Sequence, residues 1–268
     1  MAKLGDFHDL AVDLDGPIAT IEIQRPPNNF FDVALVRAIG DALLALDEVP
    51  ECRAVVLASQ GKNFCAGANF GEGRNLQSTT SAGARSGRSG SGHLYQEGVR
   101  LFEAETPIVA AVQGAAIGGG LGLALVADFR VASPESRWSA NFARLGFHHG
   151  FGLTVTLPAI VGQQKALDLL YTGRRIDGEE AHRIGMADHL VPLERVRDRA
   201  REVAMEIAEA GPLAVRSIRR TMRRGLADRI RIATDHELVE QDWLRATEDF
   251  KEGIASTAER RPPKFQGR

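Results

Sequence analysis

Three consecutive glycines interrupt an otherwise apolar stretch of the chain at residues 108–133. Residues 107–112 read as a buried strand, and residues 121–127 have the composition of a short apolar helix. The glycines at 118–120 lack a Cβ, so the backbone can turn sharply there and present N–H groups to a ligand. The dipole of the following helix favours negative charge at this place. The stretch therefore predicts either an oxyanion or anion site, or a turn whose small residues only permit close packing.

A second turn of small residues, FCAGAN at residues 64–69, follows the apolar β-prone run at 54–58. Two such turns can each supply one backbone N–H to a single carbonyl oxygen. The presence of both turns favours the oxyanion site over simple close packing.

Strand and helix patterns alternate over the first two-thirds of the chain. Residues 18–24 alternate as a half-buried strand and end at the turn formers RPPNN, and residues 33–49 recur at helical spacing. Residues 129–132 are again β-prone. Helical segments follow at 165–171, 193–210 and 213–224, with no convincing strand after residue 191. The pattern predicts an α/β core followed by a helical region.

Composition narrows the class of protein. The chain is 44% hydrophobic with a net charge of -2, which fits a globular core and gives no general attraction to nucleic acid or an anionic membrane. Cys52 and Cys65 are too few for a disulfide framework and lack metal-ligand spacing, so we expect a reducing compartment and no metal site. No signal peptide or membrane span is apparent, which predicts a soluble cytoplasmic protein. The Gly, Ser and Arg-rich residues 69–92 predict a mobile loop, either a solvated excursion or a lid.

The order and spacing of these motifs resemble the crotonase superfamily, also called the enoyl-CoA hydratase/isomerase family. The resemblance covers nearly the whole chain, from the RPP turn through FCAGAN and TPIVAAVQGAAIGGG to the closing RPPKF. It implies an α/β crotonase-like spiral of β-β-α units over residues 1–195 and a C-terminal helical trimerisation region over residues 196–268. It also implies a homotrimer or hexamer and an acyl-CoA substrate, with coenzyme A as part of the substrate and no separate cofactor.

The resemblance carries site roles over to particular residues. Ala68 and Gly119 match the two positions whose backbone N–H groups form the family's oxyanion hole. In the family, coenzyme A is contacted by the turns that follow the strands predicted here at 18–24 and 54–58. It is also contacted by a C-terminal tail, which often reaches it from a neighbouring subunit. In this chain these positions are Pro27, Asn28, Ala66, Lys264 and Phe265.

Three acid/base positions of the family lack a carboxylate here. The two glutamates of hydratases align with Gly122 and Phe142, and the carboxylate of related isomerases, hydrolases and a dehalogenase branch aligns with Gly150. Hydration requires one group to activate water and another to deliver a proton. We therefore expect neither ordinary hydratase activity nor dehalogenation by the carboxylate route.

His148 and His149 are the best remaining acid/base candidates, because they fall in a segment that lines the pocket of relatives and histidine titrates near neutrality. The alternative is that they only bond to backbone carbonyls at a Gly-rich turn. Tyr95 and His93, after the predicted loop, and Glu72, just past FCAGAN, are weaker candidates.

Basic residues are dense between 216 and 231. We predict that they form a solvated or phosphate-facing stripe on a helix whose apolar residues Leu213, Val215, Ile218 and Met222 face inward. Three functions remain open at this point: an enzyme that stabilises a thioester enolate or tetrahedral anion, an acyl-CoA-binding protein without chemistry, and a scaffold protein. Five phenylalanines near the expected pocket favour an aromatic, cyclic or bulky acyl group: Phe30, Phe31, Phe142, Phe147 and Phe151.

Overall fold

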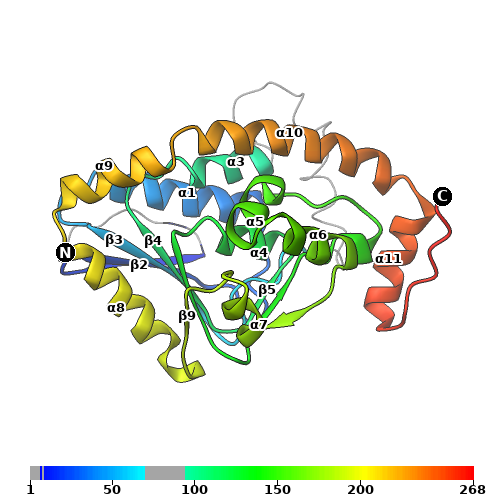
Figure 1. The fold of residues 1–268 in the computed structure, drawn as a ribbon, viewed down its shortest axis with the longest axis horizontal. Helices are drawn as coiled ribbons and strands as arrows, with labels where there is room; N and C mark the ends of the chain where they lie inside the picture. Colours follow the sequence, from blue (N-terminus) through cyan, green and yellow to red (C-terminus); the bar gives the residue numbers. More distant parts are fainter. Residues whose placement is uncertain (1–6, 8, 70–93) are drawn as a thin grey trace.

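The computed structural model describes residue 7 and residues 9–69 and 94–268. Most of the predicted loop, together with Glu72 and His93, lies outside these ranges. A six-stranded sheet with the order β1-β2-β3-β4-β6-β9 forms the centre of the fold (Figure 1). Its strands are β1 (Leu10–Asp15), β2 (Ile18–Ile23), β3 (Ala54–Ser59), β4 (Ile108–Val112), β6 (Phe129–Ala132) and β9 (His189–Leu190). β1 and β2 pair antiparallel, and the remaining neighbours pair parallel.

The structure also contains a smaller sheet and a set of helices that pack around the central sheet. The sheet has the order β5-β7-β8, with β5 (Ala115–Ile117), β7 (Arg137–Ser139) and β8 (Ile176–Asp177). The helices are α1 (Val33–Asp47), α3 (Leu94–Leu101), α4 (Gly119–Ala124), α5 (Leu153–Val161), α6 (Gln163–Thr172), α7 (Gly178–Arg183), α8 (Val196–Ala208), α9 (Pro212–Met222), α10 (Leu226–Arg245) and α11 (Glu248–Glu259), with short 3-10 turns at Ala143–Leu145 and Leu193–Arg195. The predicted α/β class is confirmed.

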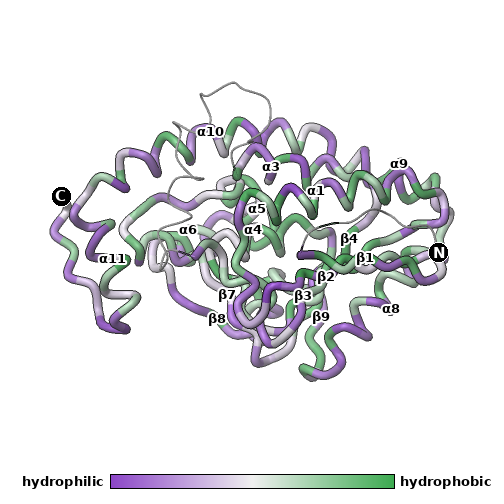
Figure 2. Tube along the Cα trace, turned by 180° about the vertical axis from the view of Figure 1, so that it is seen from behind, coloured by the Kyte–Doolittle hydropathy of each residue, from purple (hydrophilic) through white to green (hydrophobic). Residues whose placement is uncertain are grey.

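Alternate residues of the central strands bury on opposite faces of the sheet, as the strand period requires. In β3, Val55 and Leu57 pack in the main core with α1, whereas Val56 and Ala58 pack against α8. Hydrophobic residues follow the central strands in Figure 2. The division at residue 195 stays a prediction, although α8, just beyond it, covers one face of this sheet.

Helix α1 shows how local signals fix an element. The Asp32 side chain accepts a hydrogen bond from the Leu35 amide at 2.9 Å and so caps the first turn. Apolar residues then recur on the face that is fully buried, at Leu35, Ile39, Leu43 and Leu46. This helix begins at the residue that the sequence predicts and ends two residues earlier, at Asp47.

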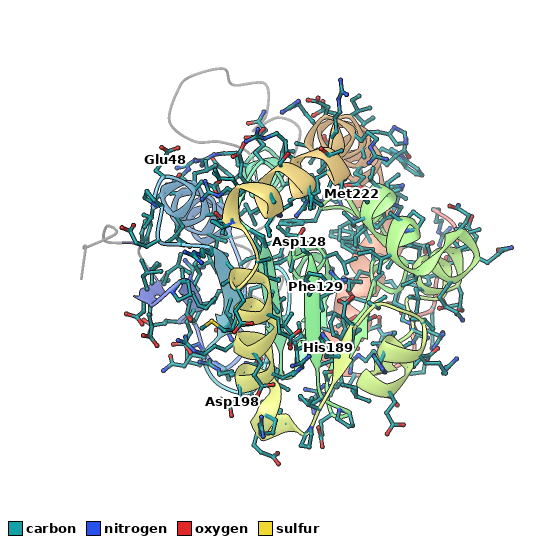
Figure 3. All side chains as sticks on the ribbon, turned by 60° about the vertical axis from the view of Figure 1, so that its left-hand side comes forward. Glu48, Asp128, Phe129, His189, Asp198 and Met222 are labelled. Carbon is teal, nitrogen blue, oxygen red and sulfur yellow. The ribbon has the colours of Figure 1, made fainter. Side chains whose placement is uncertain are left out.

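In helix α9, arginine points toward the core, whereas the apolar residues that were predicted to face inward are exposed. Leu213, Ile218 and Met222 are 84%, 62% and 80% exposed, whereas Arg219 is only 8% exposed. The guanidinium groups of Arg219 and Arg223 bind Asp128 at 2.8 and 2.9 Å. Figure 3 labels Asp128 next to Phe129, the first residue of β6.

The prediction of inward apolar residues on α9 is therefore wrong. A largely buried carboxylate such as Asp128 is costly unless it is paired, so the arginine side of the helix turns inward. The apolar side of α9 is left on the surface of the single chain.

No helix in the described ranges combines the length and the apolar character that crossing a bilayer would demand.

Candidate active site

The two small-residue turns are joined by backbone hydrogen bonds. The Cys65 amide donates to the Ala115 carbonyl at 2.8 Å, and the Ile117 amide donates to the Cys65 carbonyl at 3.0 Å. Cys65 and Ala116 thus form an isolated parallel bridge. A Cβ added to Gly120 would lie 2.0 Å from the Cys65 carbonyl oxygen, so only glycine allows this approach. The pairing places the FCAGAN turn directly beside the start of α4.

Ala68 and Gly119 lie where the FCAGAN turn meets the start of α4. Gly119 is the first residue of α4, so its N–H has no acceptor within the helix. Gly67 has a φ of 81°, and a Cβ built on it would lie 3.6 Å from the Gly119 nitrogen. Neither the Ala68 nor the Gly119 amide donates a hydrogen bond to an acceptor in the described part of the chain. Two adjacent amides of this kind are what an oxyanion hole requires.

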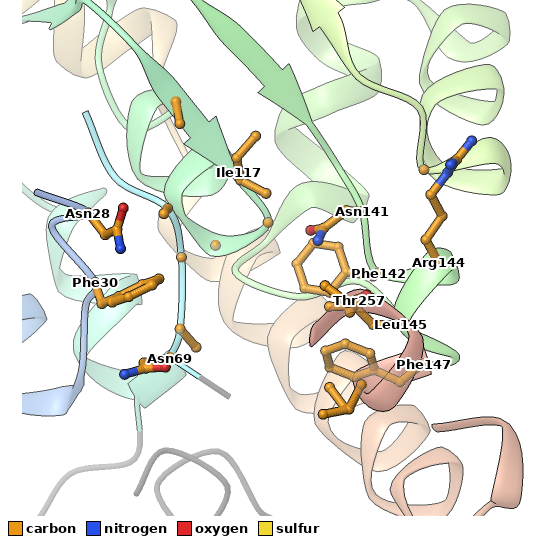
Figure 4. Close-up of a pocket in the computed structure, with 18 of the residues that line it drawn as sticks. Asn28, Phe30, Asn69, Ile117, Asn141, Phe142, Arg144, Leu145, Phe147 and Thr257 are labelled. Carbon is orange, nitrogen blue, oxygen red and sulfur yellow. The ribbon is translucent and has the colours of Figure 1, made fainter. Parts of the chain in front are cut away.

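Both turns open into a cavity of about 1160 Å³. Figure 4 shows Asn28, Phe30 and Asn69 along one side, and Phe142 and Phe147 along the other. The lining also contains the backbone of Ala66, Ala68, Gly118 and Gly119 and the side chains of Tyr95, Asn141, Gln241 and Arg245. Aromatic rings and a few polar groups thus surround the two amides, which is typical of a small-molecule site.

The predicted coenzyme contacts divide into two groups. Asn28 and Ala66 line the cavity, and the Asn28 carbonyl accepts from the Ala66 amide at 2.9 Å. Pro27 lies just behind them, with its carbonyl bound to the side chain of Asn63 at 3.0 Å. Lys264 and Phe265 do not line this cavity, although Pro263 directly before them does. The tail folds back on its own chain, where the Lys264 amide donates to Glu252 on α11 at 2.7 Å.

Comparison with known proteins identifies the family to which a chain with this site belongs. Residues 14–268 match the model of the family described as enoyl-CoA hydratase/isomerase. The chain belongs to the enoyl-CoA hydratase/isomerase family.

Relatives of the same family match over nearly their whole length. A crotonyl-CoA hydratase of Syntrophomonas wolfei is 32% identical, with 97% of this chain and 98% of the relative covered. A carnitinyl-CoA dehydratase of Salmonella enteritidis is 31% identical, with 95% and 97% covered. The crystal structure of an enoyl-CoA hydratase/isomerase from Pseudoalteromonas atlantica superposes with a TM-score of 0.84 at 28% identity, covering 96% of this chain and 100% of that one. The predicted crotonase-like fold is confirmed.

The three positions that lack a carboxylate are filled by aromatic groups. A Cβ on Gly122 would lie 2.7 Å from the ring of Phe151, and a Cβ on Gly150 would lie 1.7 Å from the hydroxyl oxygen of Tyr95. Phe142 itself lines the cavity and packs on Phe147, with ring centroids 5.5 Å apart. Carboxylates at 122 and 150 would therefore need neighbouring rings to move.

The structure does not bring His148 and His149 to the cavity with the two turns. They line a second cavity of about 700 Å³, beyond Phe142 and Phe147. His148 Nδ1 bonds to the His149 carbonyl at 2.8 Å, and His149 Nε2 bonds to Thr154 Oγ1 at 2.8 Å.

Burial, followed by repulsion from neighbouring histidine charges, lowers the pKa of His149 to about 3. This histidine is therefore neutral at physiological pH and bonded away from the oxyanion turns. The structure thus places both rings in the second cavity and not beside the two turns, and the acid/base role of the pair stays a prediction.

Tyr95, Gln241 and Arg245 are the polar side chains that sequence reasoning undervalued. Tyr95 is 5% exposed and lies at the start of α3, whereas Gln241 and Arg245 come from α10. Gln241 Nε2 donates to the Tyr95 hydroxyl at 2.8 Å, and Arg245 donates to Gln241 Oε1 at 3.1 Å. Nothing in the sequence near residue 241 indicates a site, because α10 joins the cavity only through the fold.

Proposed function

We propose that this chain is an enzyme that binds an acyl-CoA thioester with its carbonyl oxygen between the N–H groups of Ala68 and Gly119. The hydrogen-bonded pairing of Cys65 with Ala116 carries this proposal, because it sets the two amides side by side in one cavity. Two preorganised N–H donors stabilise the negative charge that develops on a thioester oxygen, in either an enolate or a tetrahedral intermediate.

Coenzyme A enters this proposal as part of the substrate, with no separate cofactor. Asn28 and Ala66 lie beside the turns, and four basic side chains at the cavity can attract the coenzyme phosphates: Lys62, Arg137, Arg144 and Arg175. Both curated relatives are named for reactions on CoA thioesters. The tail residues Lys264 and Phe265 remain candidates for contact with the coenzyme of a neighbouring subunit.

The acyl group that the cavity suits best is aromatic, cyclic or bulky. Phe30, Phe31, Phe142 and Phe147 line the space next to the two turns. Such rings favour a flat or branched apolar group over a short linear one, because they offer broad apolar contact.

The reaction differs from hydration by two glutamates, since positions 122, 142 and 150 hold Gly, Phe and Gly. The same observation favours a second candidate, an acyl-CoA-binding protein without chemistry. Incubation with a panel of aromatic and aliphatic acyl-CoA thioesters separates the two. Turnover together with binding supports an enzyme, binding alone supports the second candidate, and failure to bind any thioester contradicts both.

We propose further that the chain assembles as a homotrimer or hexamer in the cytoplasm. Leu213 and Met222 on α9 and Ile232 on α10 are 84%, 80% and 72% exposed, and apolar surface of this kind marks contact sites between subunits. Light scattering of the purified protein tests the assembly, with Met222→Glu expected to weaken it. A monomer at micromolar concentration would contradict the proposal.

A further inference from the structure

We propose that the hydroxyl of Tyr95 is the group that exchanges a proton with the α-carbon of the bound thioester, and that Gln241 positions it. The inference rests on the proposed function, because it takes the thioester oxygen to lie between Ala68 and Gly119. It adds the proton-transfer group that the glycines at 122 and 150 leave missing.

Packed aromatic rings connect the oxyanion turn with Tyr95; Phe31 and Tyr95 line the cavity, and Phe151 is buried between them. A Cβ on Gly119 would lie 2.1 Å from the ring of Phe31, so this ring packs against the turn. The Phe31 and Phe151 centroids are 5.5 Å apart, and Tyr95 meets Phe151 edge-on with centroids 6.4 Å apart. Tyr95 thus lines the same cavity as Ala68 and Gly119.

The Tyr95 hydroxyl also occupies the space where a side chain at position 150 would begin. A Cβ on Gly150 would lie 1.7 Å from the hydroxyl oxygen and 2.7 Å from Gln241 Nε2. A carboxylate from residue 150 and the hydroxyl of Tyr95 thus exclude each other. The phenol stands where the resemblance places an acid/base carboxylate in related isomerases and hydrolases.

The hydrogen bonds around Gln241 fix which of its amide atoms faces the Tyr95 hydroxyl. Gln241 Nε2 lies 2.9 Å from the His148 carbonyl, which can only accept, and Oε1 lies 3.1 Å from an Arg245 N–H, which can only donate. The amide orientation is therefore determined, and Nε2 donates to the Tyr95 oxygen at 2.8 Å. The backbone of Phe151 also hydrogen-bonds to that oxygen, so the phenol proton is given to an acceptor other than these two groups. Gln241 is fully buried, which holds this arrangement in place.

The charges around Tyr95 suit a donor that keeps its proton until the enolate forms. Burial is the main cause that raises the pKa of Tyr95 above its ordinary value of 10, and the Glu237 charge adds to the rise. Arg245 and the Gln241 N–H oppose it, so both stabilise the phenolate that remains after proton transfer.

The step balances without a further reactant. The O–H bond of Tyr95 breaks and an α-carbon–H bond forms with the electron pair of the enolate double bond, while the thioester carbonyl is restored. The phenolate then takes a proton from water. In reverse, the phenolate removes an α-proton, and the enolate charge passes to the oxygen held by Ala68 and Gly119.

Exchange of the α-protons of phenylacetyl-CoA in D₂O tests this step without knowledge of the natural reaction. Mass spectrometry of the thioester measures deuterium uptake above the enzyme-free rate between pH 7 and pH 9. We expect the wild-type rate to rise about tenfold per pH unit, because the phenolate is the minor form below its pKa. Tyr95→Phe should lose about 10²–10⁴-fold of this rate. Tyr171→Phe is the matched control, since the only other tyrosine of the chain is 75% exposed and should leave the rate unchanged.

A second variant moves the hydroxyl without removing it. Gly150→Ala places a methyl group where Tyr95 now lies, so it should lower the exchange rate while equilibrium binding of phenylacetyl-CoA persists. Circular dichroism confirms that each variant is folded. Wild-type exchange that Tyr95→Phe leaves intact, or no wild-type exchange at all, would overturn the role of Tyr95. If binding shows no dependence on the N–H of Gly119 in the Gly119→Pro variant, the proposed function fails instead.

Discussion

The two sides of the main cavity are specified in different ways. The side formed by the FCAGAN and GGG turns consists of backbone, and small residues are required there because carbonyl oxygens approach to within about 2–3 Å of the missing Cβ atoms. The opposite side consists of residues from α3, α10, α11 and the segment before α5. A backbone site leaves a pattern in the sequence, whereas a site of side chains from distant elements does not.

The largest expected effect concerns the side of the main cavity that is formed by side chains. Crotonyl-CoA should be hydrated slower than by the crotonyl-CoA hydratase of Syntrophomonas wolfei by several orders of magnitude. Gly122 and Phe142 offer no carboxylate at the two positions where the resemblance implies acid/base groups, and each such group is worth about 10²–10⁴-fold. The two enzymes are compared in one absorbance assay. Hydration at a rate similar to the relative, retained in His148→Ala and His149→Ala, would contradict our account of this side of the cavity.

A smaller effect is expected on the side of the cavity that is formed by the backbone of the FCAGAN and GGG turns. Gly119→Pro removes the N–H proposed to bind the oxyanion, and loss of one such donor costs about 10²–10³-fold in turnover. Any side chain here meets Phe31, so the matched control is Gly119→Ala, which adds the same Cβ but retains the N–H. Turnover of the best thioester in the panel should fall much further in the proline variant. Equal losses in both variants would assign the effect to the clash with Phe31.

The smallest effect concerns the second cavity. The folded state holds the pKa of His149 at about 3, below the unfolded value of 6.5, so the neutral form is favoured by folding. This contribution to stability is complete above pH 6.5 and declines as the pH falls toward 3, by up to about 1.4 kcal/mol per pH unit.

Urea unfolding of His149→Gln should therefore show a weaker loss of stability between pH 7 and pH 5 than the wild type. Turnover should stay unchanged in the variant, because His149 lies outside the main cavity. Parallel stability curves would show that His149 does not carry the pH dependence.

The sequence predicts a helix or strand wherever the residues of that element alone decide which of its faces is buried. The runs at 18–24, 54–58, 107–112 and 129–132 form β2, β3, β4 and β6, because apolar alternation or a continuous apolar run suffices for a buried strand. The six-residue strand β1 was not predicted from the sequence. The two- and three-residue strands β5, β7, β8 and β9 were also missed, since so few residues carry no period.

Errors arose where a distant partner decided the outcome. The apolar residues of α9 resembled a core face, but Asp128, about 90 positions earlier, draws Arg219 and Arg223 inward. The case of His148 and His149 differs, because Thr154, only five residues away, bonds to His149 in the second cavity, and their acid/base role stays a prediction. Gln241 gave no signal, because only the packing of α10 brings it to Tyr95.

The most direct test of the oxyanion hole is a crystal structure of the protein with a bound, unreactive acyl-CoA analogue that retains the thioester carbonyl. We expect its oxygen to lie about 2.7–3.1 Å from the backbone nitrogens of both Ala68 and Gly119. A fully bound coenzyme whose carbonyl oxygen lies elsewhere in the cavity would contradict the account.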